Sequence, residues 1–182
     1  MHLFWIGLIF LLLQGNVTIA GTAVHLLPDT LGFLLLFIGM MRMKKQSRRF
    51  AAGSVAALVF GILALGQAVL TYAVPDFSDT LLFGDSILTL ISDIILLGKL
   101  LTLYLLILGL GELAQTRNAD LKQKPLHMLW IILACANIPI LALSVVTANL
   151  YNPPDTLVKI AYFVYTVMAI LIFLISAAMI VF

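Results

Sequence analysis

The residues of this sequence that could bind a ligand are polar side chains placed inside long apolar runs. Lys99 is the clearest case, because an ammonium group in lipid is costly unless it faces a helix-bundle interior or a wet cavity. Amides and a carboxylate in neighbouring apolar runs complete a set that suits hydrogen bonding to a small polar or zwitterionic molecule. We therefore predict an outward-facing ligand pocket lined by Gln14, Gln67, Asp93, Lys99 and Asn137.

The same side chains have a simpler interpretation. Amides in membrane helices often join one helix to another through hydrogen bonds worth about 0.6 to 2 kcal/mol each. A long side chain such as that of Lys99 can also extend to the lipid headgroups from the outer third of a span. Asp93 and Lys99 are separated by about 9 Å along a helix and do not form an i,i+4 pair, so each is expected to find another partner.

Common catalytic motifs are missing from the sequence. It contains no metalloprotease H-E-x-x-H, no G-x-S-x-G elbow, no P-loop and no dinucleotide fingerprint. The histidines, His2, His25 and His127, are widely separated, and the single Cys135 cannot form an intrachain disulfide. We therefore expect no catalytic residue, no metal site, no cofactor and no nucleic-acid partner.

Composition defines the solvent around these residues. Apolar residues make up 63% of the 182 and charged residues 10%, with a mean hydropathy of +1.18, whereas soluble domains carry about 25% charged residues. Apolar runs as long as the roughly 20 residues that a helix needs to cross a bilayer recur along the chain. The sequence predicts an all-α, polytopic transmembrane bundle, a single domain over residues 1–182 with membrane lipids as partners. The expected spans are residues 3–21, 30–43, 51–73, 93–113, 126–148 and 157–182.

Charge placement predicts the orientation of the bundle, because lysine and arginine collect in short cytoplasmic loops. Most of the basic residues fall in the second and fourth predicted loops, namely Arg42, Lys44, Lys45, Arg48, Arg49, Arg117, Lys122 and Lys124. The opposite loops hold Asp29, Asp76, Asp79, Asp85 and Asp155, with Lys159 nearby. We therefore expect six spans with both termini in the cytoplasm, and a five-span arrangement is the alternative.

Local patterns predict where some helices begin and bend. The tripeptide Asp-Thr-Leu starts at Asp29, Asp79 and Asp155, each time shortly after a proline and before an apolar run. Aspartate, threonine and a preceding proline are typical of a helix N-terminus. Pro139, close to Asn137, predicts a kink in the fifth span, because proline removes a backbone hydrogen bond.

The segment from residue 79 to 113 is the most irregular part of the prediction. It contains no proline, and as one helix it would be about 52 Å long, which exceeds a straight crossing. We expect residues 81–92 to form an interfacial or re-entrant segment, with a break near Gly84 or Gly98.

Small residues line one face of the predicted span 51–73. Gly53, Ala57, Gly61, Ala64 and Ala68 recur every three or four residues, a pattern that lets helix backbones approach closely in membranes. We predict tight packing on this face, either within one chain or against a partner protein or second copy through Gly53, Ala57 and Gly61.

One stretch of the chain resembles a bacterial protein family. Residues 25–35 read H-L-L-P-D-T-L-G-F-L-L, and Ile38-Gly39 and the arginine-rich loop follow. This resembles small multi-pass membrane proteins of Gram-positive bacteria, whose usual pattern has Phe-Ile at Thr30-Leu31 and Tyr at Phe33. The resemblance implies a bacterial plasma-membrane location and carries no known activity. Length and expected spans are also similar to the substrate-capturing subunits of energy-coupling vitamin transporters, whose alanine-spaced first-helix motif this chain lacks.

Three functional hypotheses are compatible with these patterns. The first is a non-enzymatic membrane protein that binds or helps to transport a small molecule or lipid through an outward-facing pocket around Lys99 and Asn137. The second is an accessory or regulatory subunit that acts by helix packing with a partner. The third is a lipid-modifying enzyme, which clustered acids or histidines would favour.

Overall fold

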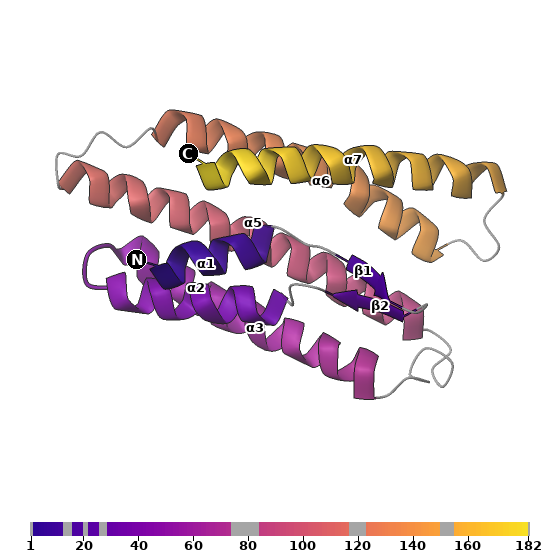
Figure 1. The fold of residues 1–182 in the computed structure, drawn as a ribbon, viewed down its shortest axis with the longest axis horizontal. Coiled ribbons are helices and arrows are strands. Elements are labelled where there is room, and N and C mark those ends of the chain that lie inside the picture. The colour runs from indigo at the N-terminus through magenta and orange to yellow at the C-terminus, as the bar shows by residue number, and fades with distance from the viewer. Residues whose placement is uncertain are drawn as a thin grey trace.

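The computed structural model describes residues 2–12, 16–19, 22–25, 29–73, 84–116, 123–149 and 155–181. These residues form a helical fold with a small two-stranded hairpin between the first two helices (Figure 1). The helices are α1 (His2–Leu12), α2 (Asp29–Met43), α3 (Arg48–Ala73), α5 (Gly84–Thr116), α6 (Gln123–Asn149) and α7 (Asp155–Val181). The strands β1 (Asn16–Ile19) and β2 (Thr22–His25) pair antiparallel.

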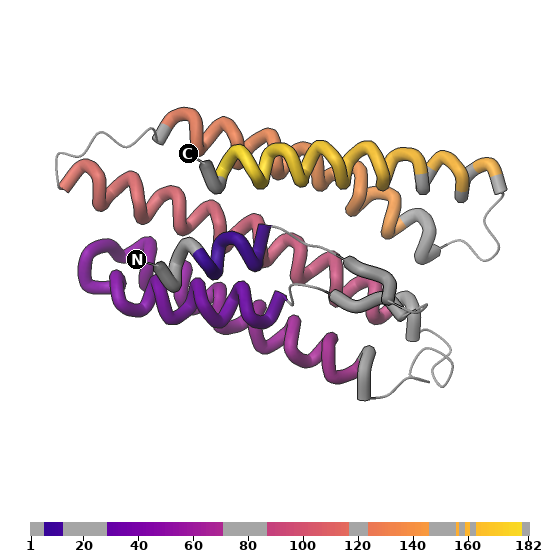
Figure 2. Tube along the Cα trace, viewed as in Figure 1, coloured from indigo at the N-terminus to yellow at the C-terminus, as the bar shows by residue number. Residues whose placement is uncertain are grey.

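Helices that follow one another in sequence are neighbours in space. α1 packs on α2, α2 on α3, α3 on α5, α5 on α6 and α6 on α7, and α1 also contacts α7. Figure 1 shows α5 between α1, α2 and α3 on one side and α6 and α7 on the other. The start of α1, the α2–α3 turn and the ends of α5 and α7 lie towards one end of the molecule (Figure 1), and Figure 2 follows the chain through the α2–α3 turn at this end. α5 is therefore the central helix that connects the two groups.

Among the described residues, three helices are long and apolar enough to cross a membrane, at Arg48–Leu70, Ile87–Thr116 and Lys124–Val145, and α7 contains a shorter apolar stretch, Phe163–Met179. Their outward faces carry large apolar side chains, such as Val55 and Phe163, which are 63% and 71% exposed. A soluble protein would bury such a continuous apolar surface. These faces instead fit a lipid environment.

The predicted first span, residues 3–21, does not form one helix. α1 ends at Leu12, and β1 and β2 follow, with Asn16 paired to His25. The β-branched run Val17-Thr18-Ile19, which lies between Gly15 and Gly21 in sequence, favours strand over helix. A two-stranded hairpin has unpaired backbone groups along its edges, so it has to lie in water or against protein, not in lipid.

α2 is shorter than a membrane crossing. Its 15 residues extend about 22 Å, against roughly 30 Å of hydrocarbon. The Asp-Thr-Leu prediction is confirmed at Asp29 and Asp155, where α2 and α7 begin, whereas Asp79 lies outside the described residues. Because α2 joins α3 through a short turn at its C-terminal end, its N-terminus lies part-way along the longer helices.

α5 continues through the segment that was expected to be irregular. It runs over 33 residues, or about 50 Å, and residues 84–92 belong to it instead of forming a separate interfacial or re-entrant segment. The predicted break near Gly98 is wrong, although the helix does begin at Gly84. Gly98 serves close packing, because a Cβ atom there would overlap the ring of Phe60 on α3. α6 is also a single helix and contains Pro139.

The small-residue face of α3 packs within the chain. Gly53 lies against Met40 of α2 and Leu105 of α5, and Gly61 lies against Phe33 of α2. Ala57 and Ala64 on the same face are buried. The tight packing that the pattern predicts therefore occurs between α3 and its neighbours α2 and α5.

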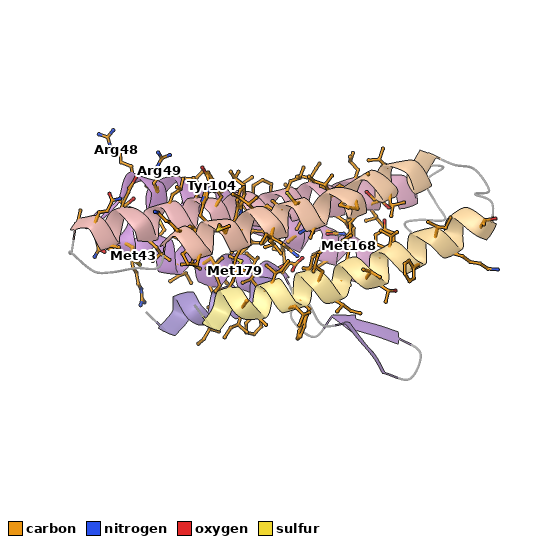
Figure 3. The ribbon with its side chains drawn as sticks, turned by 90° about the horizontal axis from the view of Figure 1, so that it is seen from above. Met43, Arg48, Arg49, Tyr104, Met168 and Met179 are labelled. Atoms are coloured by element: carbon orange, nitrogen blue, oxygen red, sulfur yellow. The ribbon has the colours of Figure 1, made fainter. Side chains whose placement is uncertain are left out.

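Polar side chains connect the α2–α3 turn to the C-terminal end of α5. The Ser47 hydroxyl accepts a hydrogen bond of 3.0 Å from the backbone N–H of Arg49, which caps α3. Ser47 Oγ also donates to one carboxylate oxygen of Glu112, and Arg49 Nε lies 3.3 Å from the other. Figure 3 shows Arg48 and Arg49 at this end of the bundle. We call it the basic end, since Arg42, Lys44, Lys45, Arg48 and Arg49 lie in or beside the turn.

Candidate functional site

An ion pair joins α5 to α2 in the interior of the bundle. Lys99 Nζ lies 2.8 Å from Asp29 Oδ2, and the two side chains are 8% and 25% exposed. Lys99 is about 20 Å along the helix axis from Glu112 at the basic end. The lysine therefore points into the bundle towards α2. It does not extend to the lipid headgroups, which was the alternative prediction.

The helical period of α2 explains why Asp29 faces the interior. Asp29, Phe33, Leu36 and Met40 recur at i, i+4, i+7 and i+11, so they share one face, and the three apolar members are fully buried. A carboxylate in the first turn also interacts favourably with the N-terminal end of the helix dipole. The charge pattern of the sequence predicts Asp29 in an external loop, and the predicted pocket does not include it.

Two further predicted site residues connect α5 to other helices. Asp93 Oδ2 accepts a hydrogen bond of 2.7 Å from Ser144 Oγ on α6, and the same hydroxyl lies 2.9 Å from the Leu141 carbonyl. Asp93 also interacts electrostatically with Tyr165 of α7. Gln67 of α3 donates from Nε2 to Ser92 Oγ. As predicted from their spacing, Asp93 and Lys99 thus have different partners.

Of the two remaining predicted residues, Asn137 lies among those that the structure describes. Asn137 is buried, and its Nδ2 donates to the Leu133 carbonyl of its own helix at 2.7 Å. Its amide nitrogen is therefore used within α6. Gln14 lies outside the described residues. Of the five predicted pocket residues, Gln67, Asp93 and Lys99 thus contact Ser92, Ser144 and Asp29, respectively.

An apolar layer separates these polar groups from the basic end. Between Thr102 and Glu112, a distance of about 15 Å, the buried side chains of α5 are apolar. α2 contributes buried apolar residues to the same part of the bundle. The layer contains Phe33, Leu36, Met40, Leu103, Leu106 and Ile107, all of them buried. The ion pair of Lys99 with Asp29 therefore lies farther from the basic turn than this layer.

Two hydroxyl groups in the described interior have no hydrogen-bond partner among the residues described. They are Thr102 Oγ1 of α5 and Ser176 Oγ of α7, on residues that are 0% and 1% exposed. Buried hydroxyl groups are normally paired, so an orphaned one calls for an explanation. Thr102 lies one helical turn from Lys99, on the same side of α5.

An aromatic cluster holds α6 against α5 beside Lys99. Trp130 Nε1 donates to the Leu100 carbonyl at 2.9 Å. The Trp130 and Tyr104 ring centroids are 4.7 Å apart, and the His127 ring lies 6.1 Å from that of Trp130. Figure 3 shows Tyr104 towards the basic end of the molecule. Contacts of this kind stabilise the position of α5 and thereby of Lys99.

Within the described ranges, no group of three or more histidine, cysteine, aspartate or glutamate residues could hold a metal ion. Comparisons of the chain with protein-family models, with curated proteins and with solved structures find no match.

Proposed function

We propose that this chain is a multi-pass protein of the bacterial plasma membrane, with both termini in the cytoplasm, that binds a small polar molecule or lipid headgroup from outside. The ligand would bind at Lys99 and Asp29. The observation that carries the proposal is the ion pair between these two residues within apolar helices. Ionisable groups in such positions are rare and mark ligand, ion or proton pathways.

The arrangement of polar and apolar groups supports access from the outer side. If the basic end is cytoplasmic, the layer from Phe33 to Met40 on α2 and from Leu103 to Ile107 on α5 lies on the cytoplasmic side of the ion pair. On the other side, α1 and α2 give way to the β1–β2 hairpin. Water and ligand would reach Asp29 from there, and any transport to the cytoplasm would require the apolar layer to open.

A native mass spectrum of the gently extracted protein tests the proposal. We expect the wild-type chain to retain a small molecule or lipid, and Lys99→Ala to lose it. Lys159→Ala is the matched control, because this lysine is exposed on α7. Unchanged retention in Lys99→Ala, or a wild-type protein that carries nothing, would contradict the proposal. Removing both charges, in Lys99→Met with Asp29→Leu, separates lost binding from the instability of a single unpaired charge.

The hypothesis of an accessory subunit stays a prediction, and it requires a docking surface other than the small-residue face of α3. Gly53, Ala57 and Gly61, through which a partner or second copy was expected to dock, lie against α2 and α5 or are buried. A partner would have to contact a different face of the molecule.

A further inference from the structure

The α2–α3 turn carries cationic side chains that no carboxylate of the described residues neutralises. Lys44, Lys45 and Arg48 are exposed, and none of them takes part in an ion pair within the described part of the chain. The neighbouring Arg49 differs, because its Nε lies 3.3 Å from a carboxylate oxygen of Glu112. Three positive charges of this turn are therefore available to an anionic partner.

Arg48 lies at the end of a lipid-facing stripe on α3. Val55, Ile62 and Val69 follow it at intervals of seven residues, which places the four residues on one face of the helix. The three apolar side chains are 63%, 62% and 53% exposed, and α3 is long and apolar enough to cross a membrane. This face therefore contacts acyl chains, and Arg48 lies where their headgroups would be.

The spacing along α3 matches the depth of one lipid leaflet. Along the helix axis, Val55 lies about 10 Å and Ile62 about 21 Å from Arg48. Half of a bilayer of about 40–45 Å, headgroups included, is about 20–22 Å. The acyl chains of a lipid whose phosphate lies beside Arg48 therefore pass Val55 and end near the level of Ile62. Figure 3 shows the Arg48 side chain extending outward from the bundle, and a guanidinium group can bind two phosphate oxygens at once.

We infer that Lys44, Lys45 and Arg48 bind the headgroup of an anionic phospholipid whose acyl chains cover Val55 and Ile62. The inference rests on the proposed membrane location and concerns a surface separate from Lys99. An anionic headgroup is attracted by all three cations, whereas a zwitterionic headgroup carries an ammonium group that they repel. Each basic residue near an anionic lipid surface strengthens the attraction about fivefold.

Native mass spectrometry of the delipidated protein in detergent, titrated with single lipids, tests the inference. The probes are phosphatidylglycerol and phosphatidylcholine with the same acyl chains. We expect the wild-type protein to bind phosphatidylglycerol about tenfold or more tighter than phosphatidylcholine, since three cations contribute. Inorganic phosphate at the same concentrations should not displace the lipid, because it has no acyl chains. Equal binding of the two lipids, or full displacement by phosphate, would overturn the inference.

Substitutions in the turn test where the headgroup binds. Arg48→Gln should weaken phosphatidylglycerol binding about fivefold, and the triple variant Lys44→Gln, Lys45→Gln, Arg48→Gln should bind the two lipids equally. Lys159→Gln is the matched control, because this exposed lysine lies on α7. It should leave the preference unchanged. All of these side chains are exposed, so the variants should keep the wild-type unfolding temperature. A triple variant that retains the wild-type preference would overturn the assignment.

Lys99→Ala separates this surface from the site of the proposed function. It should keep the preference for phosphatidylglycerol, whereas Arg48→Gln should keep the ligand that depends on Lys99. Loss of the lipid preference in Lys99→Ala would show that the lipid binds at Lys99, which would overturn the inference and leave the proposed function standing. A lipid preference that depends on Arg48, together with no ligand at Lys99, would have the opposite meaning.

Discussion

Lys99 and Asp29 illustrate how a charge becomes tolerable inside an apolar bundle. Each group alone would lose its hydration without compensation, whereas together they form a contact of 2.8 Å with little exposure to solvent. The stability of the pair therefore depends on both members being present. A ligand could bind at this site only by forming hydrogen bonds with Lys99 or Asp29 in addition to the ion pair.

Removal of one member of the pair should destabilise the protein more than removal of both. We expect Lys99→Met to lower the free energy of unfolding by about 3 kcal/mol, because Asp29 is left without its cation. Lys99→Met combined with Asp29→Leu should recover most of this loss. Thermal unfolding followed through Trp130, which hydrogen-bonds to α5 at Leu100, measures the difference. A double variant as unstable as the single one would contradict this account.

At the level of helices, glycine determines how closely α3 and α5 approach. Gly98 faces the ring of Phe60, and Gly109 faces the ring of Phe50, so each aromatic side chain occupies space that a Cβ would fill. The two contacts lie on opposite sides of the level of Lys99 and Thr102 along α5. Packing of α3 therefore contributes to the position of the ion pair.

Gly98→Ala should destabilise this interface, because its Cβ would overlap the Phe60 ring. Overpacking of this kind costs about 1–3 kcal/mol. Gly66→Ala on α3 is the matched control: nothing lies within 4 Å of its Cβ position, and alanine favours a helix by about 0.5–1 kcal/mol over glycine. Unfolding temperatures of the two variants should therefore shift in opposite directions.

A second substitution makes the Gly98 prediction specific. Phe60→Leu removes the ring, so it should reduce the cost of Gly98→Ala when the two are combined. If the costs of the two substitutions simply add, the overlap is not the cause.

At the scale of the whole molecule, charge, hydropathy and helix length divide the bundle into two unlike ends. The basic end contains the α2–α3 turn and the end of α5 (Figures 1 and 3). The Lys99–Asp29 ion pair lies beyond the apolar layer, towards the opposite end. This division is what the proposed outward-facing site requires.

Cysteine labelling of intact cells tests the orientation. With the exposed Cys135 replaced by alanine, Lys159→Cys should react with a membrane-impermeant maleimide added outside. Arg48→Cys should react only after the cells are permeabilised, since positive charges favour the cytoplasmic side. The reverse pattern would place Asp93 on the cytoplasmic side and exclude the proposed direction of access.

The sequence alone was enough to predict the helical class, the long apolar helices, the starts of α2 and α7 and the close packing along Gly53 and Gly61. These features depend on residue type and spacing within one segment, because hydropathy, helix capping and side-chain size act locally. It also showed that Asp93 and Lys99 would not pair with each other, because six residues along a helix keep them apart.

Only the tertiary structure decided that Asp29 pairs with Lys99, that Asn137 turns to its own helix and that α5 continues past Gly98. The ion pair and the packing at Gly98 depend on residues of a second helix: Asp29 of α2 meets the lysine of α5, and Phe60 of α3 fills the space beside Gly98. The early end of α1 likewise reflects strand pairing between residues 16–19 and 22–25. Interactions between segments are set by packing in three dimensions, so local spacing cannot predict them.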